Sequence, residues 1–114
     1  MGERIITIAD HARSSEEAAV KTVLHSTDTS STSVWVVRPG QQVRLHTHHH
    51  AGDVWVCLAG SGLYHPEPGV DVPLHAGQVA VAPKDACHGL TNTGDEDVVF
   101  VSVCPETSDY EPID

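Results

Sequence analysis

The segment between Gly40 and Gly60 constrains this chain more than any other, because it holds four of the nine histidines. In a strand, residues two apart point to the same face. His46 and His48 are therefore expected to present their imidazoles together. Asp53 follows a short turn and opens an apolar run. A hairpin at that turn would bring the Asp53 carboxylate beside the two imidazoles, a donor set suited to a first-row transition metal.

A second β-prone segment supplies a further candidate ligand. Residues 77–83 form a short run that ends in proline, and His88 follows shortly after. We interpret His88 as the fourth member of the donor set. His49 and His50 are interpreted as neighbours of the site or as solvent-facing residues. The remaining histidines are interpreted as ordinary surface residues: His11, His25, His65 and His75.

The spacing in these two segments resembles the two motifs of the cupin family. The first motif is glycine, five residues, His-x-His, three or four residues, glutamate, six residues and glycine. Its counterparts here, at matching spacings, are Gly40, His46, His48, Asp53 and Gly60. The counterparts of the second motif are Gly77, Pro83, Asp85, His88 and Asn92. The chain departs from the family pattern twice, with Asp53 where glutamate is usual and Asp85 where glycine is usual.

The resemblance implies an all-β, single-domain, double-stranded β-helix (jelly-roll) barrel with one divalent metal near its axis. The implied ligands are His46, His48, Asp53 and His88, and mixed imidazole and carboxylate donors suit Fe, Mn, Ni, Co or Zn. We expect residues 1–33 to form N-terminal strands and a loop, residues 34–104 the core barrel, and residues 105–114 an acidic tail. Asn92 is interpreted as a residue that fixes a turn or a strand end.

The shorter aspartate at position 53 leaves two arrangements open. Its side chain lacks one methylene of glutamate and reaches about 1.5 Å less. Asp53 therefore either binds the metal directly, if the strand sits closer, or holds a metal-bound water.

Strand alternation also assigns neighbours to the site. If the histidines face the interior, Arg44 shares their face, and Trp55 shares the face of Asp53. Arg44 is then either an anchor for a substrate carboxylate or an ion-paired residue at the barrel mouth. Trp55 is either a pocket wall or a core residue. Elsewhere, Arg4–Ile8 is expected to form an edge strand and Ser26–Ser33 a turn or loop.

Composition limits the partners of this chain of 114 residues. Its formal net charge of −10 argues against nucleic acid and anionic membrane surfaces. No segment resembles a signal peptide or a membrane span, and three cysteines without paired spacing favour a reducing, cytoplasmic setting. The apolar outward side chains Val54, Val56 and Leu58 need a cover, so we expect a homodimer.

Two classes of function fit these features. The first is a small metalloenzyme, either a dioxygenase-like oxidoreductase or an isomerase or lyase, acting on a small organic acid or sugar. The second is a non-catalytic protein that binds a metal or small molecule as a sensor, carrier or accessory protein. The sequence names no catalytic residue and does not select the metal or the substrate, because one fold supports many chemistries.

Overall fold

Strands dominate this protein. The computed structural model describes residues 4–47, 52–105 and 111–112. No helix in these segments is long and apolar enough to cross a membrane. The elements, in chain order, are the 3₁₀ helix η1 (Ile8–Asp10) and the strands β1 (Val20–Ser26), β2 (Ser30–Val37), β3 (Gln42–Thr47), β4 (Asp53–Ala59), β5 (Ser61–Glu67), β6 (Val70–His75), β7 (Val79–Ala82), β8 (Cys87–Thr91), β9 (Val98–Pro105) and β10 (Glu111–Pro112).

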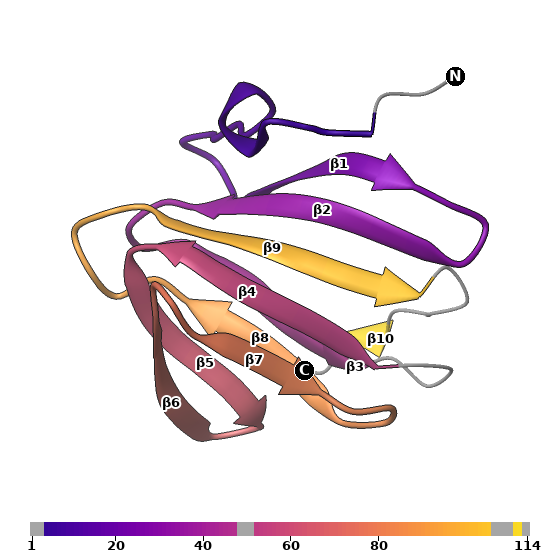
Figure 1. The fold of residues 1–114 in the computed structure, drawn as a ribbon. Helices are drawn as coiled ribbons and strands as arrows, with labels where there is room; N and C mark the ends of the chain where they lie inside the picture. Colours follow the sequence, from indigo (N-terminus) through magenta and orange to yellow (C-terminus); the bar gives the residue numbers. More distant parts are fainter. Residues whose placement is uncertain (1–3, 48–51, 106–110, 113–114) are drawn as a thin grey trace.

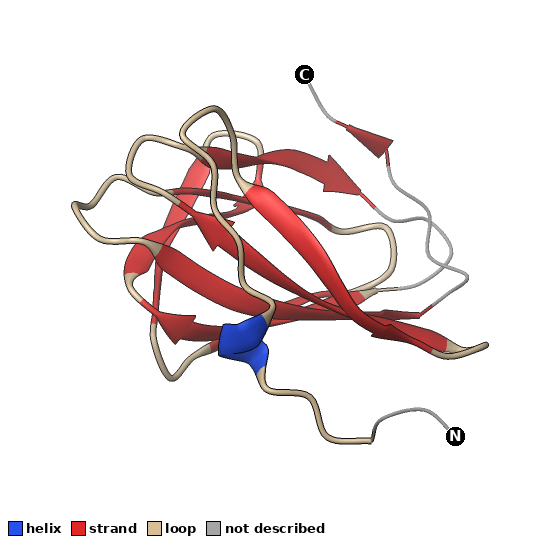
Figure 2. Ribbon diagram, turned by 90° about the horizontal axis from the view of Figure 1, so that it is seen from above, coloured by secondary structure: helices blue, strands red, loops and turns tan. Residues whose placement is uncertain are grey.

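The strands form two five-stranded sheets, and all their pairings are antiparallel. One sheet has the order β1-β2-β9-β4-β7, and the other has the order β10-β3-β8-β5-β6. Consecutive strands such as β3 and β4 thus lie in different sheets, and the chain winds back and forth between the two layers (Figure 1). Seen from above, the layers enclose a common interior (Figure 2). This winding is the double-stranded β-helix expected from the sequence.

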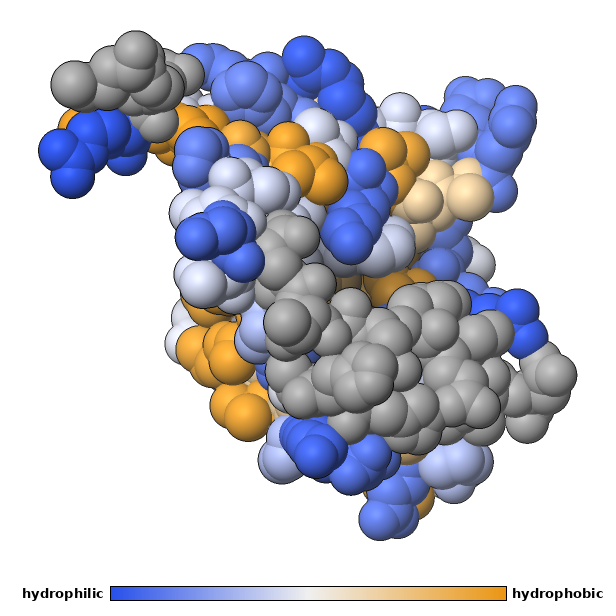
Figure 3. Space-filling model, turned by 90° about the vertical axis from the view of Figure 1, so that its right-hand side faces the viewer, coloured by the Kyte–Doolittle hydropathy of each residue, from blue (hydrophilic) through white to orange (hydrophobic). Residues whose placement is uncertain are grey.

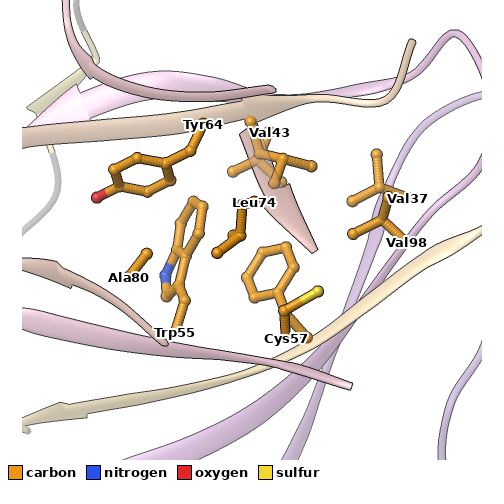
Figure 4. Close-up of a cluster of buried hydrophobic side chains, with 10 residues drawn as sticks. Val37, Val43, Trp55, Cys57, Tyr64, Leu74, Ala80 and Val98 are labelled. Atoms are coloured by element: carbon orange, nitrogen blue, oxygen red, sulfur yellow. The ribbon is translucent and has the colours of Figure 1, made fainter. Parts of the chain in front are cut away.

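The core lies between the inner faces of the two sheets. Trp55, Leu90 and Phe100 are almost fully buried there. The Trp55 and Phe100 rings stack with their centroids 4.3 Å apart, and the surrounding cluster is drawn in Figure 4. Fully burying one large apolar side chain stabilises the fold by about 1.5–3 kcal/mol. The core therefore holds the two sheets together.

The N-terminal segment differs from its predicted strand. Residues 5–7 have no regular structure, and η1 follows, with the His11 amide donating to the Ile8 carbonyl. Ile6 and Ile8 line a pocket of about 450 Å³ together with β1, β2 and β9 residues such as Leu24 and Val101. The segment thus lies against residues of β1, β2 and β9 and does not pair with β1, the edge strand of that sheet. β-propensity alone does not make a strand without such pairing.

The predicted loop between β1 and β2 is shorter in the structure. Ser30 already belongs to β2, because it pairs with Pro105 of β9. The turn before it is closed by Thr27, whose hydroxyl oxygen accepts hydrogen bonds from the amides of Thr29 and Ser30 at 3.1 and 2.9 Å. Polar composition indicated a loop here, whereas pairing with β9 extends the strand through these serines.

Candidate metal centre

A β-bulge in β3 turns His46 into the barrel. Val43 pairs with Leu90 and His46 pairs with His88, so residues 44 and 45 together oppose the single residue Gly89. A bulge of this kind shifts the alternation of faces by one residue. Val43 and His46, three residues apart, are consequently both buried, each with 4% of its surface exposed.

The same bulge corrects the predicted position of Arg44. Simple alternation placed Arg44 on the face of His46, but Arg44 is exposed while His46 is buried. The reason is the inserted residue, which no periodicity in β3 itself reveals. A substrate-anchoring role for Arg44 remains a prediction, now for a residue on the outside of β3.

Three of the four residues predicted as ligands converge at one end of the core. His46, Asp53 and His88 are all buried, and each offers one donor atom within 4.8 Å of the others. They come from β3, β4 and β8, and thus from both sheets. His48 lies outside the described residues, as do His49 and His50.

The distances suit a single ion. The Nε2 atom of His88 lies 3.3 Å from Oδ2 of Asp53, and the His46 and His88 rings lie 4.4 Å apart between centroids. With bonds of about 2.0–2.2 Å to nitrogen and oxygen, two ligands at right angles are about 3 Å apart. The donors are therefore spaced as neighbouring ligands of one metal, and their mixed chemistry fits a first-row transition ion.

A backbone contact sets the tautomer of His46. Its Nδ1 atom lies 2.6 Å from the carbonyl oxygen of Arg44. A carbonyl only accepts hydrogen bonds, so Nδ1 carries the proton and Nε2 keeps the lone pair. This is the usual way in which proteins orient a histidine for metal binding. The β3 bulge thus supplies both the direction of the ring and the carbonyl that fixes its tautomer.

The carboxylate of Asp53 is buried. Burial raises the pKa of Asp53 to about 6, although hydrogen bonds from the Trp55 side chain and the Val54 backbone act in the opposite direction. The indole Nε1 of Trp55 donates to Oδ2 of Asp53 at 3.1 Å. A cation at this point would favour the ionised carboxylate and thereby offset the effect of burial.

Trp55 is a core residue next to the donor cluster, and its role as a pocket wall stays a prediction. Only 1% of its surface is exposed, and its ring stacks on His88 with centroids 4.2 Å apart and planes 30° from parallel. With the hydrogen bond to Asp53, Trp55 therefore contacts two of the three clustered donors. The sequence placed Trp55 on the correct face, but its support of both side chains appears only once β4 and β8 come together.

The remaining motif residues shape the ends of strands. Asn92 is fully buried, and its side-chain amide donates to the carbonyls of Val37 and Glu96 at 2.8 and 2.7 Å. It fixes a chain reversal, as expected. Asp85 has a positive φ of 70° in the turn closed by the Ala86 amide and the Pro83 carbonyl. Glycine is favoured at such a position, which explains the residue usual in the family.

The other histidines confirm the surface interpretation in part. His11, His25 and His75 are exposed. His65 is half-buried and lies between Asp71 and Thr91, each at 2.8 Å from one of its ring nitrogens. This hydrogen-bonded chain lies apart from the metal-type cluster, on the outer side of the sheet that contains β5, β6 and β8.

Comparison with known proteins agrees with this architecture. The model of the cupin domain family matches residues 33–104, which is more than half of the chain. A crystal structure of an uncharacterised protein with a double-stranded β-helix domain, from Klebsiella pneumoniae, superimposes with a TM-score of 0.94. The two sequences are 32% identical, and the superposition covers 99% of each chain.

Two further proteins resemble this chain, one in sequence and the other in fold. An oxalate-binding protein of Thermotoga maritima is 37% identical over 65 residues, which are 57% of this chain and 53% of that protein. The chain thus spans about half the length of this relative. A polyketide cyclase of Streptomyces resistomycificus has a TM-score of 0.83 over 100% of this chain and 87% of the cyclase, at 18% identity. At that identity the likeness is one of fold.

Proposed function

The chain belongs to the cupin family, and from this membership we propose that it is a mononuclear metalloenzyme that acts on a small organic acid. The proposed ligands are His46, His48, Asp53 and His88. The observation that carries the proposal is the convergence of three buried donors from three strands within 4.8 Å. Four protein ligands would leave coordination positions for a substrate oxygen in an octahedral shell.

The charge of the site favours an acid as substrate. A divalent ion with one carboxylate and neutral imidazoles carries a net charge of about +1, whereas the chain as a whole carries −10. The centre would then be a positive point in a negative molecule, and a small carboxylate would be attracted to it. The similarity to an oxalate-binding protein supports the same class of ligand.

The bound ion would supply Lewis-acid polarisation of a carboxylate or carbonyl oxygen. The chain's own residues prepare the site for this. Arg44 fixes the tautomer of His46 through its carbonyl, and Trp55 holds Asp53 through its indole N–H. Burial of the donors excludes water and strengthens electrostatic interactions at the centre.

Metal analysis tests the site directly. We expect purified protein to hold close to one first-row metal per chain after dialysis against a mild chelator. His88→Ala and His48→Ala should lose most of it, whereas His75→Ala, which alters an exposed histidine, should retain it. Equal metal content in all four proteins would contradict the ligand assignment.

A non-catalytic binding protein is the second candidate, because the donor cluster alone would serve either role. Oxalate titration by calorimetry, followed by assays of oxygen uptake and product release over a panel of organic acids, separates the two. Turnover supports the enzyme. Stoichiometric binding across the panel without turnover would support a sensor, carrier or accessory protein.

A further inference from the structure

Tyr64 has a polar group that the fold itself does not use. Its side chain is 7% exposed, and its hydroxyl has no hydrogen-bond partner among the described residues. Buried hydroxyls are normally hydrogen-bonded, and one without a partner lowers the stability of the folded protein. A phenylalanine would fill the same space without this disadvantage. Packing of the core therefore does not account for the hydroxyl.

The ring of Tyr64 lies against the donor cluster. It is edge-on to His88 with centroids 6.3 Å apart and edge-on to Trp55 at 5.6 Å. In Figure 4 the Tyr64 hydroxyl lies on the same side of the cluster as the Trp55 indole nitrogen, and that nitrogen donates to Asp53. The hydroxyl is therefore directed toward the end of the core where the metal-type donors meet.

Electrostatics agree with this placement. Burial raises the pKa of Tyr64, and the negative charge of Asp53 raises it further. The phenol is thus close enough to Asp53 to experience its charge, and it keeps its proton at neutral pH. A protonated phenol is a hydrogen-bond donor that complements an anionic oxygen.

We propose that Tyr64 is a substrate-binding residue, whose hydroxyl donates a hydrogen bond to a carboxylate oxygen of the small acid bound at the metal. This inference rests on the proposed function. It gives the site a neutral donor from β5, on the same side of the cluster as the indole N–H that holds Asp53. The ligand then satisfies the buried hydroxyl that the protein leaves without a partner.

Calorimetric titration of Co(II)-loaded protein with oxalate tests the inference. Tyr64→Phe should bind Co(II) as the wild type does, but its Kd for oxalate should rise by about one to two orders of magnitude, as for loss of a hydrogen bond to a charged group. Oxalate should also perturb the near-ultraviolet tyrosine absorption of the wild type and leave that of the variant unchanged. In the metal-free state, the variant should melt at the same temperature as the wild type or higher.

Thr91→Val is the matched control, since it removes a hydroxyl on the outer face of the same sheet, where Thr91 contacts His65. It should retain the wild-type affinity for oxalate. Equal oxalate affinity in Tyr64→Phe and wild type would overturn the inference alone, as would a lower melting temperature of the metal-free Tyr64→Phe protein. A wild type that binds neither Co(II) nor oxalate would overturn the proposed function and this inference together.

Discussion

Burial and metal binding have opposite effects on the ionisation of Asp53. As a buried carboxylate it disfavours its own charge, and its pKa of about 6 lies above the ordinary value of 3.8. As the metal ligand that we propose, it must be ionised. The 3.3 Å separation from His88 fits the direct ligation that we propose, even though aspartate is shorter than the glutamate usual in the family. The folded metal-free protein should therefore carry an electrostatic cost that the ion removes.

This cost predicts the pH dependence of the metal-free protein. Because the folded pKa is raised, folding favours protonated Asp53, and this stabilisation is complete below pH 3.8 and is lost as pH rises through about 6. The rise of the Asp53 pKa from 3.8 to about 6 corresponds to about 3 kcal/mol in the free energy of unfolding. In the presence of chelator, Asp53→Asn should be more stable than the wild type at pH 7 by about 1–3 kcal/mol. Urea unfolding at several pH values measures this.

Asp53→Asn should bind metal more weakly than the wild type, although its metal-free form should be more stable. Loss of the charged oxygen should lower the affinity for Co(II) clearly, and wild-type affinity should itself weaken as pH falls through 6, where Asp53 takes up a proton. An Asp53→Asn protein that is less stable than the metal-free wild type and retains full affinity would return Asp53 to a purely structural role.

Asp85 stores a small amount of backbone strain. Its φ of 70° is favoured by glycine and costs other residues about 1 kcal/mol or more. Asp85→Gly and Asp85→Ala both remove the carboxylate, so their difference isolates the backbone. We expect the glycine variant to be the more stable of the two by about 1 kcal/mol in urea unfolding. Equal stabilities would show that the turn relaxes to a different conformation.

At the scale of the element, the β3 bulge depends on a glycine in the neighbouring strand. A Cβ atom on Gly89 would lie 3.0 Å from three backbone atoms, which are Cα and N of Leu45 and the carbonyl oxygen of Val43. Backbone atoms cannot rotate out of the way as a side chain can. Gly89 therefore leaves room for the extra residue of β3. The bulge formed by that residue in turn allows His46 to point inward.

Gly89→Ala should consequently disturb both the fold and the site. We expect a loss of about 1–3 kcal/mol in the free energy of unfolding, as for other overpacked positions, and a weaker affinity for Co(II). Gly94→Ala is the control, because its nearest contact would be an ordinary 3.5 Å. A Gly89→Ala protein with wild-type stability and affinity would mean that the bulge does not need this glycine.

At the scale of the whole molecule, one outer face of the barrel is left apolar. The N-terminal segment lies over the part formed by β1, β2 and β9. Over β9, β4 and β7, large hydrophobic side chains remain exposed: Leu58 (44%), Val79 (54%), Val81 (62%) and Val103 (41%). Hydrophobic surface appears at the left edge of Figure 3, the side that faces the viewer in Figure 1, where β4 and β7 lie.

Such a face predicts a homodimer. Sedimentation equilibrium at micromolar concentration should give twice the mass of one chain, which is 12.2 kDa. The double variant Val79→Lys and Val81→Lys should shift the mass toward the monomer, because charged side chains oppose burial at the contact. Val70→Lys on β6, where 39% of Val70 is exposed, should not. A monomeric wild type would contradict the expectation.

The sequence by itself determined most of the strands and most of the donor set, because these depend on local pattern. The spacing of His46, Asp53 and His88 indicated a metal-type cluster, and the described donors do converge. The barrel was implied by the resemblance of that spacing to the cupin motifs. Only the tertiary structure decided the face of Arg44, the stacking of Trp55 on His88 and the direction of Tyr64. Each of these depends on a partner in another strand, and residues distant in sequence leave no periodic signal in the strand they contact. Gly89, more than forty residues from His46, is needed to explain why that histidine points inward.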